Sequence, residues 1–375
     1  MTDDAIADAD DYRFMAHALR LACRGLYTTD PNPRVGCVLV KRGAVVGEGW
    51  HVWAGSAHAE IHALTMAGEQ ARGATAYVTL EPCCHYGRTP PCTDALLAAG
   101  VTRVVAAMED PYNRVAGAGL EQLRRAGVVV ECGLMATEAR ALNPGFVKRL
   151  TRGYPYVRGK LAMSLDGRTA MASGASQWIT GAAARLDGQR LRARSSAVMT
   201  GIGTVLADDP SLNVRLTGQS GRQPLRVIVD PELRTPLQAR SLRLDGQVLV
   251  FTAVTEPGAW APLQAAGAEV MAVPRRGEGL DLKAALAELA RREINEVHLE
   301  CGATLAGAML QAGLLDELVV YLAPLLMGDG ARGLFHLPGL TQMSQSIPLV
   351  IIDIRAVGRD WRITAQPAPG SVNLE

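Results

Sequence analysis

The chain has 375 residues, which is long for one domain, and two domains are the first expectation. Its 48% hydrophobic and 20% charged residues are typical of a globular protein, and a formal net charge of +1 argues against nucleic acid or an anionic membrane as partner. An acidic N-terminus without a basic, apolar leader, and the lack of a long apolar run, predict a cytoplasmic protein with no membrane span. The odd number of cysteines, seven, does not suggest a disulfide framework.

The first half alternates predicted helices and strands. Phe14, Ala18 and Leu21 recur at helical spacing, and short apolar runs bounded by glycine or proline are typical of strands. Such alternation predicts a layered α/β domain, with its site beyond the carboxyl ends of the strands. The expected helices are 12–21, 58–68, 93–99 and 119–126, and the expected strands are 35–40, 45–49, 76–80, 104–107 and 128–132.

The pattern that organises this half is His58, Glu60, Cys83 and Cys92. One imidazole and two thiolates suit tetrahedral zinc and leave the fourth position open to water. Glu60 lies close enough to take a proton from water and hand it to a leaving amine without ligating the metal. The zinc-deaminase signature is H-x-E followed by P-C-x-x-C, but here eight residues, 84–91, separate the two cysteines.

A structural zinc site is the alternative interpretation. Such a site is closed by four ligands, and Cys84 or His85 could supply the fourth. It would leave Glu60 without a role, and His58 lies far from the cysteines in sequence, so catalysis is favoured. With two cysteines available, His62 is expected to be structural despite its helical spacing from His58.

The second half begins after a predicted linker at 139–155, where Asn143–Phe146 indicates a domain end and 151–155 an exposed turn. Gly201 and Gly203 do not complete a dinucleotide-binding fingerprint, because Leu206 stands at the third glycine position. Residues 366–375 have the composition of a disordered tail. The expected strands are 156–162, 197–200, 225–230, 248–251, 270–273, 297–300, 318–323, 349–355 and 361–365, and the expected helices are 182–193, 282–292 and one ending near 310.

The segment Glu81-Pro82-Cys83-Cys84-His85-Tyr86-Gly87-Arg88-Thr89-Pro90-Pro91-Cys92, together with His58-Ala59-Glu60, resembles the deaminase half of the bifunctional riboflavin-biosynthesis deaminase/reductase family. That family carries the same longer loop between the cysteines. The resemblance implies a cytidine-deaminase-like three-layer domain at 1–150 with one zinc ion. It also implies that Asn32, His51 and Arg88 bind substrate. The residues alone would favour a turn at Asn32 and a structural histidine at His51, and would suggest a solvated loop charge at Arg88 equally.

The second half resembles the reductase half of the same family. Lys-x-Ala-x-Ser-Leu-Asp-Gly at 160–167 and Ser-x-Trp-Ile-Thr at 176–180 carry the resemblance. It implies a dihydrofolate-reductase-like α/β domain at 151–375 that uses NADPH. The implied cofactor contacts are Ala162, Trp178, Thr204, Asp208, Gly302, Ala303, Thr304 and Leu305. The implied substrate contacts are Lys160, Ser176, Arg192, Leu212, Arg215 and Glu300.

The implied function has two steps on one phosphorylated pyrimidine, in a protein expected to be a homo-oligomer. Zinc-dependent hydrolysis removes an amine from 2,5-diamino-6-(5-phosphoribosylamino)pyrimidin-4(3H)-one, and NADPH then reduces the ribosyl group to a ribityl chain. The competing hypotheses are a nucleic-acid base deaminase with an appended domain and a zinc-stabilised binding module. Near-neutral charge and only four phenylalanines argue against the first, and ammonia release would exclude the second.

Overall fold

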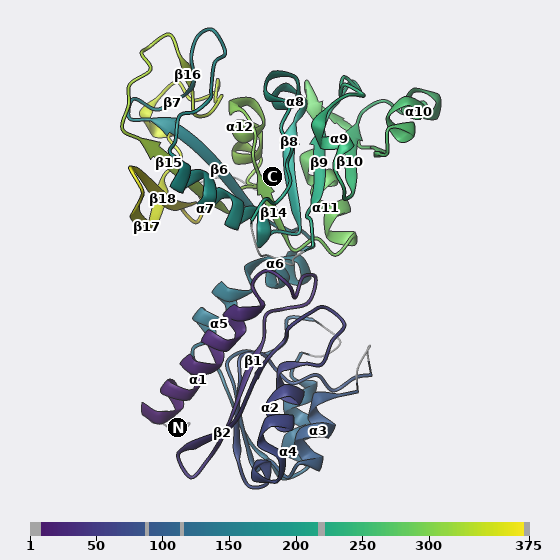
Figure 1. Cartoon of the computed structure of the whole chain (residues 1–375), viewed down its shortest axis with the longest axis vertical. Coiled ribbons are helices and arrows are strands. Elements are labelled where there is room, and N and C mark those ends of the chain that lie inside the picture. Colours follow the sequence, from purple (N-terminus) through teal and green to yellow (C-terminus); the bar gives the residue numbers. More distant parts are fainter. Residues whose placement is uncertain (1–8, 87–89, 113–115, 217–221, 371–375) are drawn as a thin grey trace. The chain divides into compact units, whose positions relative to one another are not determined.

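The computed structural model describes residues 9–86, 90–112, 116–216 and 222–370. The chain contains two compact units, Met1–Arg152 and Gly153–Glu375. Each unit has its own sheet and its own hydrophobic cores. The boundary between the units follows Arg152, whereas the sequence pattern predicts it after residue 150. Figure 1 labels the helices and strands of both units.

The first unit is built on a five-stranded sheet in the order β2-β1-β3-β4-β5. β1 pairs antiparallel with β2 and β3, whereas β3, β4 and β5 run parallel. Parallel neighbours require crossover connections, and α3 and α4 lie in these crossovers. The strands are β1 (Gly36–Lys41), β2 (Ala44–Trp50), β3 (Thr75–Val78), β4 (Arg103–Ala106) and β5 (Val129–Cys132).

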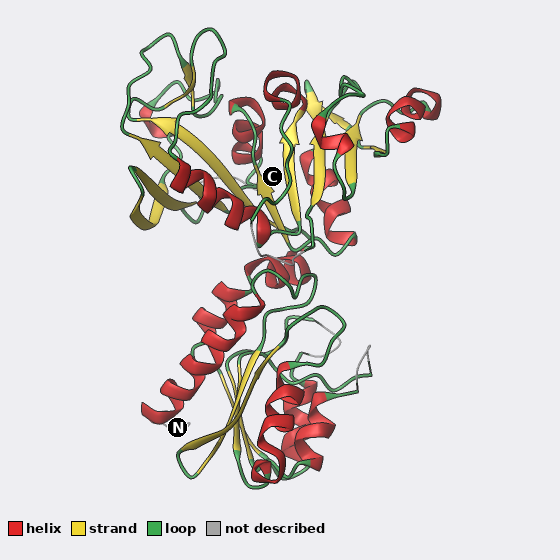
Figure 2. Cartoon of the chain, viewed as in Figure 1, coloured by secondary structure: helices red, strands yellow, loops and turns green. Residues whose placement is uncertain are grey.

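Helices cover both faces of this sheet and make three layers, as Figure 2 shows. Strand side chains alternate between faces, so Leu39 joins the core with α2, α3 and α4 while Val38 and Val40 join the core with α1 and α5. This confirms the three-layer α/β arrangement expected for the first half. The helices are α1 (Ala9–Ala22), α2 (Ala59–Ala67), α3 (Cys92–Ala98), α4 (Ala118–Arg125), α5 (Ala136–Leu142) and α6 (Pro144–Arg152), with short 3₁₀ turns η1 (Cys23–Gly25) and η2 (Gly68–Ala71).

Two glycines of β2 bring α2 unusually close to the sheet. A β-carbon on Gly47 would lie 2.2 Å from the carbonyl oxygen of Ala63, and one on Gly49 would lie 2.4 Å from that of Ala59. Any larger residue would push the helix away from the strand. The close packing sets the start of α2, and with it His58 as the helix N-cap, against the end of β2.

The second unit has a nine-stranded sheet in the order β11-β10-β9-β8-β14-β6-β15-β18-β17. The strands from β11 to β15 are parallel, and β18 and β17 add antiparallel at one end. The strands are β6 (Tyr156–Ser164), β8 (Ala197–Gly201), β9 (Leu225–Val229), β10 (Val248–Thr252), β11 (Glu269–Ala272), β14 (Glu296–Leu299), β15 (Glu317–Ala323), β17 (Leu349–Val357) and β18 (Asp360–Pro367). Two small pairs join β7 (Arg168–Ala170) with β16 (Arg332–Gly333) and β12 (Arg275–Arg276) with β13 (Gly279–Leu280).

Helices pack on both faces of the second sheet as well. Leu286 of α11 and Met309 of α12 share one core with Val157, while Val205 of α8 and Leu263 of α10 belong to another. The long parallel sheet agrees with the dihydrofolate-reductase-like α/β domain expected here. The helices are α7 (Ala182–Ala193), α8 (Ile202–Asp208), α9 (Arg240–Arg243), α10 (Pro257–Ala265), α11 (Leu282–Arg291), α12 (Ala303–Gln311) and the 3₁₀ turn η3 (Met343–Gln345).

The expected linker at 139–155 is only partly right: the two units divide inside it, between Arg152 and Gly153, but α5 and α6 occupy most of it and run almost continuously to Arg152. Proline and glycine suggested a turn, but Pro144 occupies the first position of α6, where its missing N–H costs nothing. Asn143 accepts from the backbone N–H of Arg34 at 2.8 Å and donates to its carbonyl at 2.9 Å, which ties this segment into the first unit.

Two smaller expectations also fail. The predicted disordered tail starts too early, because β18 continues to Pro367, which pairs with Leu349. Helix α10 is not expected from the sequence either, because its prolines, Pro257 and Pro262, resemble a loop signal. None of the helices in the described part of the chain has the length and apolar character that a membrane span requires.

Candidate active sites

Three ligand-type side chains converge in the first unit. Nδ1 of His58 lies 3.3 Å from Sγ of Cys92 and 3.5 Å from Sγ of Cys83, and all three atoms lie within 4.8 Å of one another. His58 is the N-cap of α2, Cys92 is the first residue of α3, and Cys83 lies in the loop after β3. The fold therefore brings together one helix start, one loop and a second helix start.

These distances fit a zinc ion. Zinc–nitrogen and zinc–sulfur bonds of about 2.0 and 2.3 Å give a tetrahedral N···S edge of roughly 3.5 Å, close to the two separations seen here. Neither Cys84 nor His85 joins the group among the described residues, so the cluster supplies three ligands and not four. His62 stays outside it as well. Three protein ligands are the pattern of a catalytic zinc site.

The pKa values of the two cluster thiols shift in opposite directions. Contact with Cys92, and then with His58, lowers the pKa of the Cys83 thiol to about 4. The same contact, together with burial, raises the pKa of the Cys92 thiol. One thiolate is therefore favoured by the fold itself, and a divalent cation would favour the second.

Glu60 sits in the first turn of α2 beside this cluster. Its side chain is 3% exposed and lies against the Cys92 thiol. Burial raises the pKa of its carboxyl group, and the nearby His58 lowers it. A buried carboxylate that touches a metal ligand without belonging to the three-ligand group is placed for proton transfer.

His51 and Asn32 are joined next to the cluster. The His51 ring lies edge-on to His58, with 5.5 Å between centroids, and its Nδ1 lies 3.1 Å from the carbonyl oxygen of Ala57. A proton on Nδ1 leaves Nε2 as an acceptor for the Asn32 amide, whose Nδ2 is 3.1 Å away. Burial lowers the pKa of His51, which favours this neutral form. The Asn32 carboxamide is thus oriented by His51, and its oxygen remains available to a ligand.

Glu81 is a site-supporting residue that the sequence interpretation missed. Its buried carboxylate accepts backbone N–H bonds from Asp110, Gly117, Gly119 and Leu120, at 3.0, 2.9, 2.8 and 3.3 Å. These bonds hold the start of α4 against Glu81, which lies two residues before the expected zinc ligand Cys83. Its place in the Glu-Pro-Cys motif was a signal, but four partners from a distant loop cannot be read from spacing. Arg88, the expected phosphate ligand, lies outside the described residues.

In the second unit, Thr204 and Gly302–Leu305, five of the eight expected cofactor contacts, lie after the carboxyl ends of β8 and β14. The N–H of Gly302 donates to Oγ1 of Thr204 at 3.1 Å. Gly302 is the N-cap of α12, which begins with Ala303, Thr304 and Leu305, so the first backbone N–H groups have no partner within the helix. A β-carbon on Gly201 would contact the Leu305 side chain at 3.4 Å. The turn is suited to a pyrophosphate.

Glu300 and Arg192 form a paired group beside this turn. Arg192 Nε donates to Oε1 at 2.5 Å and Nη2 donates to Oε2 at 2.7 Å, while Nη1 donates to the carbonyl of Asn213 at 2.9 Å. Burial opposes ionisation of Glu300, but the Arg192 charge and hydrogen bonds hold its pKa well below the usual range. Within the described residues, three of the five guanidinium N–H groups have partners, which leaves two for a substrate anion.

Lys160 of β6 adds a third charge to the same face. Its Nζ lies 5.8 Å from the centroid of the Tyr321 ring, and it interacts electrostatically with Glu300 and Arg192. Burial lowers its pKa, Glu300 raises it and Arg192 lowers it further. Arg215, near Arg192, donates to Oδ1 of Asn213 at 3.1 Å. Four of the expected substrate contacts are therefore close to one another.

The remaining expected contacts are less concentrated. Ser176 donates to Asp208 at 3.2 Å, which joins an expected substrate residue to an expected cofactor residue. Leu212 is buried and has a left-handed backbone conformation, φ 50°. Trp178 is 66% exposed with its ring under the Arg185 guanidinium, 4.7 Å from the centroid. Ala162 pairs with Tyr321 across β6 and β15, and no contact made by its side chain distinguishes it.

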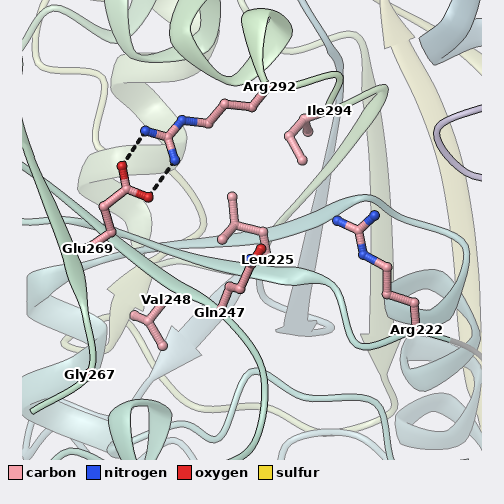
Figure 3. A pocket seen from close by; sticks show the side chains of 8 residues that line it. All are labelled: Arg222, Leu225, Gln247, Val248, Gly267, Glu269, Arg292 and Ile294. Carbon is pink, nitrogen blue, oxygen red and sulfur yellow. Dashed lines mark hydrogen bonds and ion pairs between the residues drawn. The ribbon is translucent and has the colours of Figure 1, made fainter.

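A surface hollow of about 410 Å³ lies elsewhere in the second unit, at β9, β10 and β11 (Figure 3). Arg292 on its wall is bound to both carboxylate oxygens of Glu269, at 2.6 and 2.5 Å. Arg222 and Gln247 also line it, and none of the expected site residues does. The hollow is therefore not formed by the expected site residues of the second unit.

Family models match both halves of the chain. The cytidine and deoxycytidylate deaminase zinc-binding region matches residues 8–108, which include the three-ligand cluster. The RibD C-terminal domain matches residues 155–363.

Full-length relatives agree with this division. The riboflavin biosynthesis protein RibD of Escherichia coli is 51% identical over 94% of this chain and 97% of its own length. The corresponding protein of Haemophilus influenzae is 47% identical over 96% and 98%. Among solved structures, Acinetobacter baumannii RibD has a TM-score of 0.89 at 47% identity and covers 96% of this chain and 99% of its own. The deaminase/reductase of Thermotoga maritima has a TM-score of 0.84 at 32% identity, with the same coverage.

Proposed function

This chain belongs to the RibD family of bifunctional riboflavin biosynthesis enzymes, and on that premise we propose which residues perform each step. The chain is a zinc-dependent deaminase and an NADPH-dependent reductase. It deaminates 2,5-diamino-6-(5-phosphoribosylamino)pyrimidin-4(3H)-one and reduces the ribosyl group to give 5-amino-6-(5-phosphoribitylamino)uracil. The proposal assigns the first step to the unit Met1–Arg152 and the second to Gly153–Glu375.

In the deamination step, His58, Cys83 and Cys92 hold zinc, which when bound activates water toward the amine-bearing carbon. Glu60 takes the proton of the attacking water and returns it to the departing ammonia, so one carboxylate acts as base and then as acid. Asn32 orients the pyrimidine through its carboxamide, and His51 fixes that carboxamide through the 3.1 Å contact.

In the reduction step, the second unit would bind NADPH, which would supply a hydride for the sugar carbon. The α12 N-terminus with Gly302, together with Thr204, binds the cofactor pyrophosphate. Lys160 and Glu300 face the sugar, and Lys160 can donate a proton to the opening ring oxygen. The substrate phosphate is bound by Arg215 and by the two uncommitted N–H groups of Arg192.

One observation carries the deaminase assignment: three ligand atoms lie within 4.8 Å of one another, with Glu60 against one of them. The test is a coupled assay with the diaminopyrimidine and NADPH, in which ammonia and NADPH absorbance are followed together. We expect one ammonia and one NADPH oxidised per substrate. Zinc binding without ammonia would instead support a binding module, and deamination of oligonucleotides would support a nucleic-acid deaminase.

We also propose that the protein is a homo-oligomer joined through β17, the last strand of the nine-stranded sheet. Exposed apolar side chains on both faces of an edge strand favour the addition of another strand. These side chains are Leu349, Val350, Ile351, Ile352 and Ile354, between 45% and 57% exposed. Light scattering of an Ile352→Lys variant should show a smaller particle than the unchanged chain, and an identical mass would contradict the assignment.

A cytoplasmic location is part of the same proposal. All seven cysteines are free, as in a reducing compartment. Fractionation of cells should place the protein with the cytoplasmic enzymes.

A further inference from the structure

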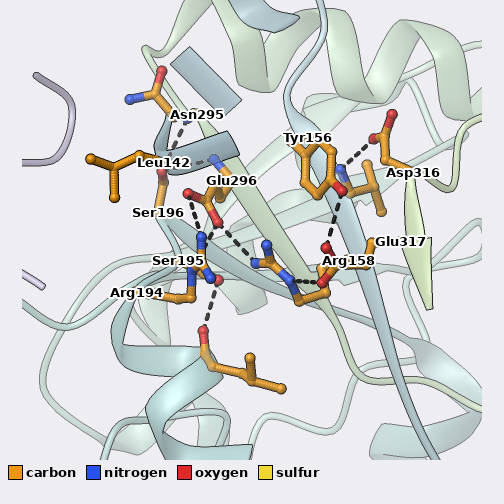
Figure 4. A network of polar contacts seen from close by, with 12 residues as sticks. Leu142, Tyr156, Arg158, Arg194, Ser195, Ser196, Asn295, Glu296, Asp316 and Glu317 are labelled. Atoms are coloured by element: carbon orange, nitrogen blue, oxygen red, sulfur yellow. Dashed lines mark hydrogen bonds and ion pairs between the residues drawn. The ribbon is translucent and has the colours of Figure 1, made fainter. Parts of the chain in front are cut away.

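A column of buried polar side chains runs along β14 in the second unit. Glu296, His298 and Glu300 alternate with apolar residues, so they share one face of the strand. Arginines flank its two ends. Arg158 Nη1 donates to Glu296 at 2.8 Å, as Figure 4 shows, and Arg192 binds Glu300. His298 is the middle member and has no exposed surface.

His298 contacts the Glu300 carboxylate directly. Its Nε2 lies 3.0 Å from Oε1, although the alignment is bent, so the contact is largely electrostatic. The proton belongs on Nε2, because an unprotonated nitrogen would place its lone pair against the carboxylate. Burial lowers the His298 pKa, Glu300 raises it, and the Arg192 and Arg158 charges lower it again. The ring is therefore neutral and leaves the Glu300 charge intact.

Core packing does not account for this histidine. Neither ring nitrogen makes a well-aligned hydrogen bond among the described residues, and unpaired buried polar atoms cost stability. A leucine of similar size would fill the space without that cost. What leucine cannot provide is a polar ring nitrogen 3.0 Å from the Glu300 carboxylate.

We propose that His298 is a positioning residue for the reduction step, which holds the Glu300 carboxylate in the orientation it presents to the sugar. The inference rests on the proposed place of Glu300 in the reductase site. Arg192 alone binds both carboxylate oxygens and can swing with them, whereas a third contact from the strand fixes the carboxylate plane. Because the His298 ring is neutral, this contact leaves the negative charge of Glu300 available to Lys160.

The experiment compares His298→Leu with His298→Gln, whose amide can place an N–H near the Nε2 position. Reduction of the deaminated pyrimidine is measured with NADPH, and ammonia release and the unfolding midpoint are measured on the same full-length samples. We expect His298→Leu to lower kcat/KM for the pyrimidine about tenfold, the lower range for a lost bond to a charged group. In His298→Leu, KM for NADPH should stay the same, and neither the rate of ammonia release nor the unfolding midpoint should fall. His298→Gln should recover the rate of reduction to within about threefold of the unchanged chain.

Two results would overturn the proposal. One is full reduction by His298→Leu; the other is an equal loss in both variants together with a lower unfolding midpoint, as expected of a structural residue. A Glu300→Gln variant separates this proposal from the function on which it rests. If Glu300→Gln reduces normally, the proposed place of Glu300 in the reductase site fails; if it is impaired while His298→Leu is not, only the positioning role fails.

Discussion

The two sites differ in how they are built. In the first unit, three side chains lie within 4.8 Å of one another, and the chemistry depends on their identity. In the second unit, residues far apart in sequence, such as Lys160 and Glu300, meet over interior strands of the sheet, and much of the proposed cofactor site is backbone N–H at a helix start. The comparison shows why a metal site leaves a compact mark in sequence, whereas a backbone site leaves mostly glycines and a turn.

The largest expected effect follows from removing a metal ligand. Cys83→Ala should lower ammonia release at least about a thousandfold, because activation of water by the metal contributes several kcal/mol. Zinc content, measured by atomic emission, should fall with it, while NADPH oxidation on deaminated substrate stays unchanged. Cys23→Ala, at an exposed cysteine of the same unit, is the matched control. Normal ammonia release by Cys83→Ala would remove Cys83 from the ligand set.

The next effect separates a proton shuttle from a ligand. Glu60→Gln preserves shape but cannot accept a proton, so ammonia release should fall at least about a hundredfold. Zinc should remain near one per chain, and reduction should be nearly unchanged. Loss of zinc would make Glu60 a ligand, and retained deamination would assign the proton transfer to another residue.

The choice between NADPH and NADH tests the second site. We expect kcat/KM on deaminated substrate to favour NADPH over NADH by at least about tenfold, equivalent to roughly 1.4 kcal/mol. The expectation rests on family membership and on the α12 turn, since a pyrophosphate seat alone does not distinguish the two cofactors. Equal efficiency with NADH would show that the 2′-phosphate is not recognised.

The smallest expected effect concerns the support of the first site. Glu81→Gln weakens charge-assisted bonds to four backbone N–H groups and should lower the free energy of unfolding of the first unit by about 1.5–3 kcal/mol. Urea unfolding measures it, with the exposed Glu121→Gln as control. An unchanged urea midpoint would mean that the Glu81 bonds to these four N–H groups do not stabilise the unit.

Local signals predicted most regular elements and the residue types of the zinc cluster. α7 has the expected bounds, and His58 caps α2 as the pattern indicated. The sequence could not predict partners set by distant packing, such as the four amides on Glu81 or His298 beneath Glu300. It also misread Pro144, because proline is equally suited to a turn and to the first position of a helix.

The most direct test of two independent sites is complementation between two variants. Glu60→Gln and Glu300→Gln are each mixed with the diaminopyrimidine and NADPH, alone and then together in equal amounts, and NADPH absorbance is followed. Each variant alone should oxidise little NADPH, because it lacks one step. The mixture should recover NADPH oxidation, because one chain deaminates and the other reduces the released intermediate. No recovery in the mixture, with each variant retaining its own half-reaction, would contradict independent sites that exchange their intermediate through solution.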